Sequence, residues 1–150
     1  MAGKEPVQID LDKLLPRLEQ LSPRFPQVVA AYLFGSHYGG RPTPLSDIDI
    51  GVLLVKGLPD MDSFHLEMTL QGELEKIFKT GKIDLVVLNK APLPIQYHAT
   101  SGKLLFCNDD DKRTDFEEYA RKYYIDCLPI YREYRKEFFK KLREGQRPGG

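Results

Sequence analysis

The sequence predicts one domain of the α+β class, in which helices and strands are mixed and a long helix comes last. Its 150 residues suit a single domain over 1–150 with a modest hydrophobic core. Its 41% hydrophobic and 29% charged residues are ordinary for a globular protein. Segments with helical spacing of apolar residues alternate with short continuous apolar runs typical of buried strands. Only the ends, 1–8 and 145–150, are expected to be flexible.

The first elements are a helix, a strand and a loop. Leucines three and four residues apart predict a helix over 10–21, with Asp10 as its N-cap. Pro23 follows and prevents its continuation. The continuous apolar run 28–34 predicts a buried strand. The segment 35–46 contains three glycines and two prolines, which predict a loop.

The middle of the chain alternates strand and helix. A second strand is expected over 48–55, and a third over 82–88. Between them 64–78 is expected to be a helix, and Gly81 suits its C-terminal end. This helix carries a broad apolar stripe made of Phe64, Leu66, Met68, Leu70, Leu74, Ile77 and Phe78. After a short segment around 92–100, residues 103–107 are expected to form an edge strand.

The last predicted helix, over 115–142, is the longest. Its main apolar stripe is expected to face the core and consists of Phe116, Tyr119, Tyr123, Cys127, Ile130, Tyr134, Phe138 and Leu142. Three further aromatic residues, Tyr124, Tyr131 and Phe139, fall outside this stripe. They are expected to form either a partner surface or additional core. Pro129 is expected to kink the helix.

Charge and cysteine content exclude several classes of protein. Lys and Arg total 22 and Asp and Glu total 22, so bulk positive charge does not favour nucleic acid, and no direct nucleic-acid binding is expected. No apolar run approaches the roughly 20 residues of a membrane helix, and the N-terminal residues lack the apolar segment of a signal peptide. Cys107 and Cys127 belong to no metal-binding motif, which indicates free thiols and a cytoplasmic location.

The informative motif is Gly35-Ser36, ten intervening residues, and then Asp47-Ile48-Asp49. Because side chains alternate along a strand, Asp47 and Asp49 would project from the same face. Gly35 would allow close backbone approach, and the Ser36 hydroxyl with nearby amides would hold phosphate groups. The alternative is that Gly35 and Ser36 form only a tight turn after the strand.

Paired carboxylates at the start of a strand repel each other, and a divalent cation would relieve that repulsion. Magnesium is the expected ion, because it binds through one or two carboxylates together with substrate phosphates. Two such ions would hold both the attacking and the leaving oxygens of a displacement. Asp84, the only ionisable residue within the run 83–88, is a candidate third ligand and general base. Its alternative role is an ion pair with Lys82.

With these residues, the sequence resembles the polymerase-beta-like nucleotidyltransferases, and the segment Ser-Asp-Ile-Asp-Ile at 46–50 is similar to that of the minimal nucleotidyltransferases. The resemblance extends through 82–86 and the tyrosine-rich segment 116–126. It implies a small mixed sheet flanked by helices and magnesium-dependent use of ATP. It also implies hetero-oligomeric pairing with a HEPN-domain ribonuclease toxin, which the antitoxin neutralises by transferring AMP to one of its tyrosines.

Carried over by motif, Gly35, Ser36 and Arg41 would bind the nucleotide, Asp47 and Asp49 the metals, and Asp84 the metal and the acceptor proton. The sequence departs from many relatives after Ser36, where their loop arginines are replaced until Arg41. In that loop, His37 is either a substitute donor or a solvated side chain. The departure favours one alternative function, an antitoxin that only binds its toxin. A further alternative, suggested by antibiotic-modifying relatives, is a nucleotidyltransferase acting on a small molecule.

Overall fold

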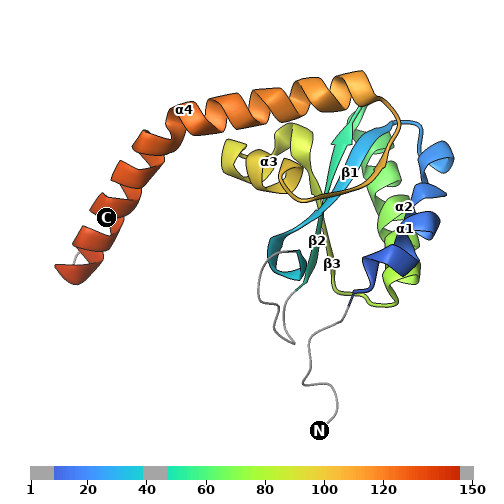
Figure 1. Cartoon of the computed structure of the whole chain (residues 1–150), viewed down its shortest axis with the longest axis horizontal. Helices are drawn as coiled ribbons and strands as arrows, with labels where there is room; N and C mark the ends of the chain where they lie inside the picture. Colours follow the sequence, from blue (N-terminus) through green and yellow to red (C-terminus); the bar gives the residue numbers. More distant parts are fainter. Residues whose placement is uncertain (1–8, 39–46, 146–150) are drawn as a thin grey trace, which may run out of the picture.

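A computed structural model describes residues 9–38 and 47–145 of the chain (Figure 1). Of the ends expected to be flexible, 1–8 and 146–150 lie outside these residues. The elements in chain order, including three short 3-10 helices labelled η, are α1 (Leu11–Glu19), η1 (Ser22–Arg24), β1 (Val28–Phe34), η2 (Gly35–His37), β2 (Ile48–Leu54), α2 (Asp60–Phe78), β3 (Ile83–Val87), η3 (Leu88–Lys90), α3 (Leu93–Thr100), β4 (Lys103–Cys107) and α4 (Asp110–Arg143).

The four strands form one mixed sheet in the order β3-β2-β1-β4. β1 pairs antiparallel with both β2 and β4, whereas β2 and β3 run parallel because α2 crosses over between them. All seven residues of β1 are buried, since it is a central strand covered on both faces. The α+β class, the mixed sheet and the edge position of β4 are confirmed.

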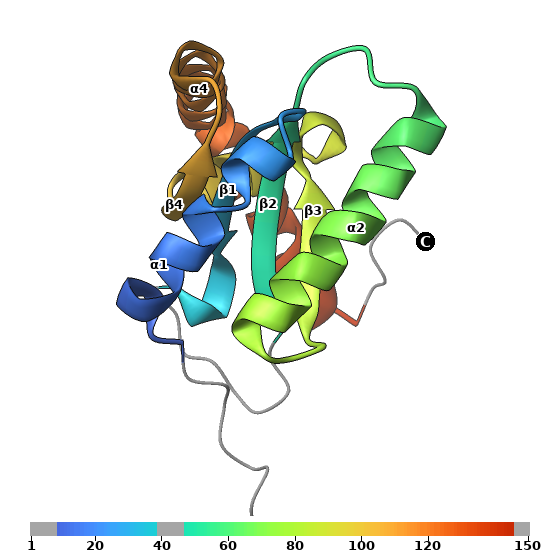
Figure 2. The same ribbon diagram turned by 90° about the vertical axis from the view of Figure 1, so that its right-hand side faces the viewer.

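Helices cover both faces of the sheet. α1 and α2 lie together on one face, in front of the strands in Figure 2, and their Leu18 and Leu70 pack with Leu33 of β1. α3 and the first turns of α4 cover the other face, where Ala99 and Phe116 pack with Tyr32. Leu33 and Tyr32 belong to different clusters because successive residues of a strand point to opposite faces.

α2 begins earlier than predicted and is capped by a different residue from the one expected. It begins at Asp60, and acidic residues in its first turn favour this N-terminus. It ends at Phe78, as predicted, but the left-handed residue that caps it is Lys79 (φ 56°) and not Gly81. Phe64 and Met68 are 59% and 58% exposed, and only the remaining members of the predicted stripe are buried.

The shorter helices also correct the sequence analysis. α1 ends at Glu19, and Asp10 occupies its N-cap position without a capping hydrogen bond from its side chain. α3 is a helix of eight residues where the sequence predicted only a short segment. Its glutamine, Gln96, is buried and donates a hydrogen bond from Nε2 to the carbonyl oxygen of Leu88 (2.9 Å).

The first turns of α4 are fastened to the sheet. Asp109 caps the helix by accepting a hydrogen bond from the amide of Lys112 (3.1 Å), which explains why it begins before residue 115. The buried Tyr32 hydroxyl donates to Glu117 (2.6 Å), which also accepts from Arg113 (3.0 Å). Burial, together with Glu117, raises the pKa of Tyr32 above its ordinary value.

The predicted core stripe of α4 is wrong, because most of it is exposed. Its exposed members are Tyr119, Tyr123, Ile130, Tyr134 and Leu142. The helix rests on α3 through a different face, where the ring of Tyr124 stacks on that of Tyr97 at 4.3 Å. α4 then changes direction and extends away from the sheet (Figure 1), with Pro129 inside the helix as the expected kink. Helical spacing revealed an apolar stripe but not which face packs.

Asn108, directly after β4, joins segments distant in the sequence. Its side-chain amide donates to the carbonyl oxygens of Ser22 (3.0 Å), Phe25 (3.0 Å) and Val28 (2.9 Å). The Ser22 hydroxyl donates a hydrogen bond to the Oδ1 atom of the same Asn108 side chain. This one residue therefore holds the turn that leads into the central strand.

Within the described residues, no helix has both the length and the apolar character needed to cross a membrane.

Candidate active site

Two of the predicted carboxylates lie side by side at the end of the sheet where β2 and β3 begin. We call this end, with the adjoining Gly35, the catalytic edge. In the parallel pairing of β2 with β3, Asp49 lies opposite Asp84, and on its other side Asp49 lies opposite Phe34 of β1. Asp49 is half-buried and Asp84 is exposed. Strand register therefore brings together two residues that are 35 positions apart in the chain.

The charges around Asp49 show how crowded this edge is. The pKa of Asp49 is raised, first by burial and then by the negative charges of Asp84 and Asp47, and a hydrogen bond with Asp84 raises it further. His37 acts in the opposite direction and lowers it. The edge therefore favours a bound positive charge, which would relieve the repulsion between the carboxylates.

Gly35 is required by the geometry of this edge. Its φ of +77° is a left-handed conformation, and a Cβ at this position would lie 2.2 Å from the Oδ2 atom of Asp49. A side chain is therefore excluded both by the backbone and by the neighbouring carboxylate. Because Gly35 has no Cβ, its backbone lies directly against the side chain of Asp49.

The turn that follows Gly35 carries the other predicted residues. The amide of Tyr38 donates to the Gly35 carbonyl oxygen (3.0 Å), which closes the turn around Ser36 and His37. Ser36 and His37 are half-buried. The turn fits either a phosphate-binding loop or a simple strand ending, so it does not separate the two interpretations of Gly35 and Ser36. Arg41 lies outside the described residues.

Asp47 lies exposed just before β2, where its charge acts on Asp49. Across 9–38 and 47–145, no three His, Cys, Asp or Glu side chains are gathered in the geometry of a metal centre. The donor set nevertheless fits magnesium, because this ion takes one or two carboxylates and completes its coordination with water and substrate phosphates. Asp49 and Asp84 provide those carboxylates on adjacent strands.

A hollow of about 450 Å³ opens between Gly35 and α3. Tyr38 follows Gly35 on one wall, and His98 and Ser101 from the end of α3 contribute the opposite wall. The sequence analysis missed His98, because α3 itself was not predicted and a lone histidine carries no motif. It also left open the role of His37, whose influence on Asp49 is visible only in three dimensions.

This arrangement combines an acidic pair, a close backbone turn and an adjoining hollow. The carboxylates would hold a divalent cation or accept a proton from a hydroxyl. The turn and the hollow would accommodate a phosphate chain and the remainder of a nucleotide. Such an edge suits phosphoryl or nucleotidyl transfer, in which positioning and charge neutralisation supply most of the catalysis.

Solved structures with a similar fold include toxin–antitoxin complexes. One, a toxin–antitoxin with AMP-PNP, is 23% identical with a TM-score of 0.51 over 91% of this chain and 98% of that chain. A second, a mutant of the toxin–antitoxin MntA-HpeT, is also 23% identical, with a TM-score of 0.52 over 91% and 98%. A third contains a tri-AMPylated Shewanella oneidensis HEPN toxin with an MNT antitoxin (20% identity, TM-score 0.50, 89% and 97%). At these identities the likeness shows the fold.

No curated protein sequence is significantly similar to this chain. The sequence model of one family, described as polymerase beta, nucleotidyltransferase, matches residues 17–111. That match spans more than half of the chain and includes the Gly35 turn and all three aspartates of the candidate site. The chain belongs to the polymerase beta nucleotidyltransferase family.

Proposed function

We propose that this nucleotidyltransferase is an antitoxin that transfers AMP from ATP to a tyrosine of a HEPN-domain ribonuclease toxin and thereby neutralises it. The observation that carries the proposal is the register of β2 and β3, which sets Asp49 against Asp84 beside Gly35. Structures of the same fold that hold AMP-PNP or an AMPylated toxin support the choice of nucleotide and acceptor. In this proposal residues 1–150 act as one nucleotidyltransferase domain in the cytoplasm, where ATP is available.

In the reaction, the tyrosine oxygen attacks the α-phosphorus of ATP, a bond forms between them, and the bond to the β-phosphate oxygen breaks to release pyrophosphate. Asp84 accepts the proton of the tyrosine hydroxyl, because it is the exposed member of the pair. The backbone of the Gly35 turn, the Ser36 hydroxyl and Arg41 orient the phosphate chain. Much of the rate would come from holding the two reactants in line.

Asp47, Asp49 and Asp84 would hold magnesium, two ions in this proposal, together with the phosphates of ATP. When bound, magnesium would neutralise the negative charge on the phosphate groups and polarise the α-phosphorus. The raised pKa of Asp49 supports this assignment, because the repulsion that raises it is relieved when a cation binds.

The sharpest test replaces the acidic pair and a matched pair elsewhere. The variant Asp47→Asn/Asp49→Asn removes the proposed ligands, whereas Asp60→Asn/Asp62→Asn changes a second Asp-x-Asp motif in the first turn of α2. Labelled ATP, magnesium and a HEPN-domain protein from the same genome are incubated with each variant. We expect at least a thousandfold loss of labelling with the first variant and little change with the second. Equal labelling by the two variants would refute the assignment.

A second function is favoured by the exposed aromatic residues of α4: the chain could neutralise the toxin by binding alone. Growth of cells that express the toxin separates the two functions. Full protection by the Asp47→Asn/Asp49→Asn variant would establish binding alone as sufficient, whereas loss of protection would establish that transfer is required.

A further inference from the structure

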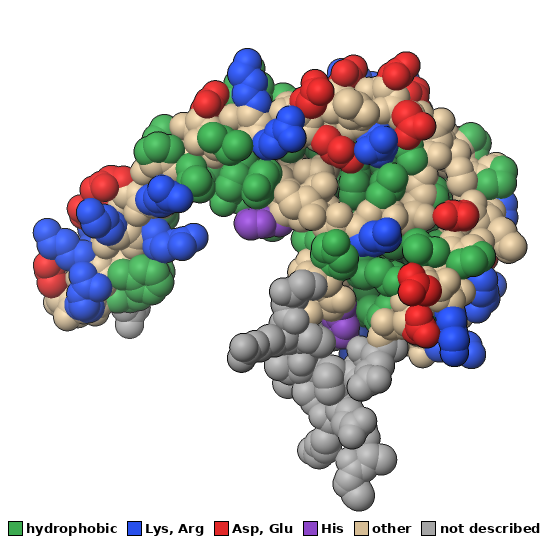
Figure 3. Space-filling view, viewed as in Figure 1, with side chains coloured by type: hydrophobic (Ala, Val, Ile, Leu, Met, Phe, Trp, Pro, Cys, Tyr) green, Lys and Arg blue, Asp and Glu red, His purple; other side chains and the backbone are tan. Residues whose placement is uncertain are grey.

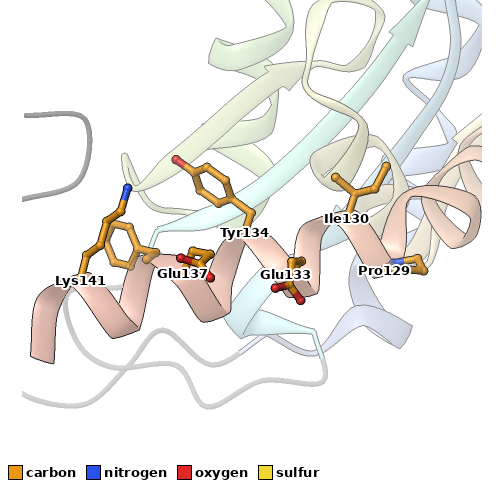
Figure 4. A pocket seen from close by; sticks show the side chains of 7 residues that line it. Pro129, Ile130, Glu133, Tyr134, Glu137 and Lys141 are labelled. Carbon is orange, nitrogen blue, oxygen red and sulfur yellow. The ribbon is translucent and has the colours of Figure 1, made fainter.

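The C-terminal part of α4, residues 129–143, is an exposed arm with two distinct characters. It presents large apolar side chains, of which Tyr134 is 72% and Ile130 is 68% exposed. Figure 4 shows Ile130, Tyr134 and Lys141 projecting from one side of the helix, where the arm lines a hollow of about 740 Å³. Residues 130–143 carry six Lys or Arg and two Glu. The arm is therefore a basic amphipathic helix with its apolar side uncovered.

A second hollow, of about 370 Å³, lies where the arm turns away from α3. We call it the arm groove, and six residues that define it are His98 of α3 and Tyr124, Tyr131, Tyr134, Phe138 and Phe139 of α4. Figure 3 shows hydrophobic side chains along the underside of α4 where the surface is hollowed. Contiguous exposed aromatic surface of this kind is typical of a protein-binding site.

The inner end of the arm groove is held in place by ring contacts. The ring of Tyr124 stacks on Tyr97 at 4.3 Å with an interplanar angle of 7°, and Tyr131 lies 5.8 Å from Tyr124. His98 lies edge-on to Tyr124 at 5.8 Å. Because these contacts tie α4 to α3, the groove keeps a fixed position relative to the sheet.

His98 connects this groove to the candidate active site. The same side chain lines the arm groove and the hollow beside Gly35. A protein seated in the arm groove would therefore extend towards the edge that carries Asp49 and Asp84. This continuity favours a partner that must also reach the catalytic residues.

We propose that the arm groove is the docking site for the acceptor protein, which places an amphipathic helix with acidic flanks along the arm. The inference rests on the proposed function, because the docked protein is the one that receives AMP. The acidic flanks follow from the excess of Lys and Arg on the arm, including Arg135 at the groove. A second copy of this chain is less suitable, because its own arm carries the same positive charge.

Docking and transfer then depend on different residues. The arm groove determines how tightly the acceptor binds, and therefore affects KM for the acceptor. The edge with Asp49 and Asp84 determines the rate of transfer once the acceptor is bound, and therefore affects kcat. A merely structural role of the arm residues would produce no such division.

The test uses the full chain, a HEPN-domain protein from the same genome and two matched pairs of variants. Tyr134→Ser/Phe139→Ser removes exposed apolar groups from the groove, and Phe64→Ser/Met68→Ser removes equally exposed ones from α2. Arg135→Glu reverses a charge at the groove, and Lys136→Glu reverses its exposed neighbour. Calorimetry without ATP measures the dissociation constant, and labelled ATP measures kcat and KM.

We expect both groove variants to weaken acceptor binding about tenfold or more and to raise KM accordingly, with kcat unchanged. The α2 variant should match the unaltered protein, and Lys136→Glu, which makes the same charge change outside the groove lining, should weaken binding clearly less than Arg135→Glu. Unchanged binding by the groove variants would overturn the inference, as would a change in self-association without a change in acceptor binding. If the unaltered chain binds the acceptor but transfers no AMP, the proposed function fails while the docking site stands.

Discussion

The catalytic edge and the arm differ in how the molecule holds them. Asp49, Asp84 and Gly35 are positioned by the backbone of adjacent strands, through the pairing of β2 with β3 and the turn after β1. The arm belongs to a single helix that is fastened only through its earlier part, by the hydrogen bond between Glu117 and Tyr32 and by the stacking of Tyr124 on Tyr97 of α3. A change at the edge must therefore disturb several elements, whereas a change in the arm disturbs almost none.

The two regions differ in how their functional residues affect the stability of the fold. At the edge, the residues needed for function destabilise the fold, because burial and the neighbouring carboxylates raise the pKa of Asp49. In the arm, the exposed apolar residues contribute little to the stability of the fold, and they stay available for a partner. Four predictions test this difference, beginning with the largest expected effect.

Gly35→Ala should lower the stability of the fold more than any other change tested at the edge. The new Cβ would lie 2.2 Å from the Oδ2 atom of Asp49, and the left-handed backbone disfavours alanine as well. We expect unfolding free energy to fall by about 2 kcal/mol and AMP transfer to fall by about a hundredfold or more. Chemical denaturation and a labelling assay measure the two effects. Normal stability together with normal transfer would show that the turn is not held as described.

Tyr32→Phe should loosen the attachment of α4 with a smaller loss. The buried hydroxyl donates a 2.6 Å hydrogen bond to Glu117, and its removal should cost about 1–2 kcal/mol of unfolding free energy. Denaturation curves of the full chain measure this loss. Tyr123→Phe, which changes an exposed tyrosine on the same helix, is the matched control and should leave stability unchanged. An equal loss of unfolding free energy in the two variants would show that the Tyr32–Glu117 hydrogen bond does not hold α4 on the sheet.

Asp49→Asn should stabilise the fold at neutral pH while it abolishes transfer. Because the pKa of Asp49 is higher in the folded state than in the unfolded chain, the folded state binds the proton more tightly. The charged carboxylate therefore weakens the fold above this raised pKa, and the penalty disappears as the pH falls below the unfolded value. We expect a higher Tm for the variant at pH 7 and equal Tm values near pH 3. A lower Tm for the variant at pH 7 would show that the charged Asp49 carboxylate stabilises the fold, contrary to this prediction.

Tyr134→Ser should have the smallest effect on stability. The side chain is 72% exposed, so its loss should change the unfolding free energy by no more than about 0.5 kcal/mol. Thermal denaturation of the full chain, compared with Tyr32→Phe, measures the contrast between the free and the fastened ends of α4. A loss as large as that of Tyr32→Phe would mean that the arm packs against the molecule.

The sequence predicted the elements well where a local signal was strong. The apolar run of β1 and the edge strand β4 lie where expected, because continuous apolar residues bounded by turns leave few alternatives. The Asp49–Asp84 pair was anticipated from strand spacing and family resemblance, although strand order itself is not encoded in either segment. Register became visible only once the two strands were paired.

Other features depended on contacts that no local pattern contains. α4 has apolar residues on more than one face, so spacing alone could not identify the face that stacks on Tyr97. α3 is short and contains Pro94, and it was missed because its helical signal is weak. The position of His98 between the arm groove and the edge depends on how α3 and α4 pack, so the sequence alone could not predict it.

The side chain of Asn108 has a consequence for the ageing of the protein. Its amide nitrogen faces three carbonyl oxygens, at Ser22, Phe25 and Val28. Spontaneous deamidation would replace this donor with a carboxylate, and like partial charges would then confront one another around the entrance to the central strand. The damage would begin far from the catalytic carboxylates, yet the strand it loosens is the one that ends at Gly35. Loss of this one amide would thus weaken the molecule at a residue that takes no part in catalysis.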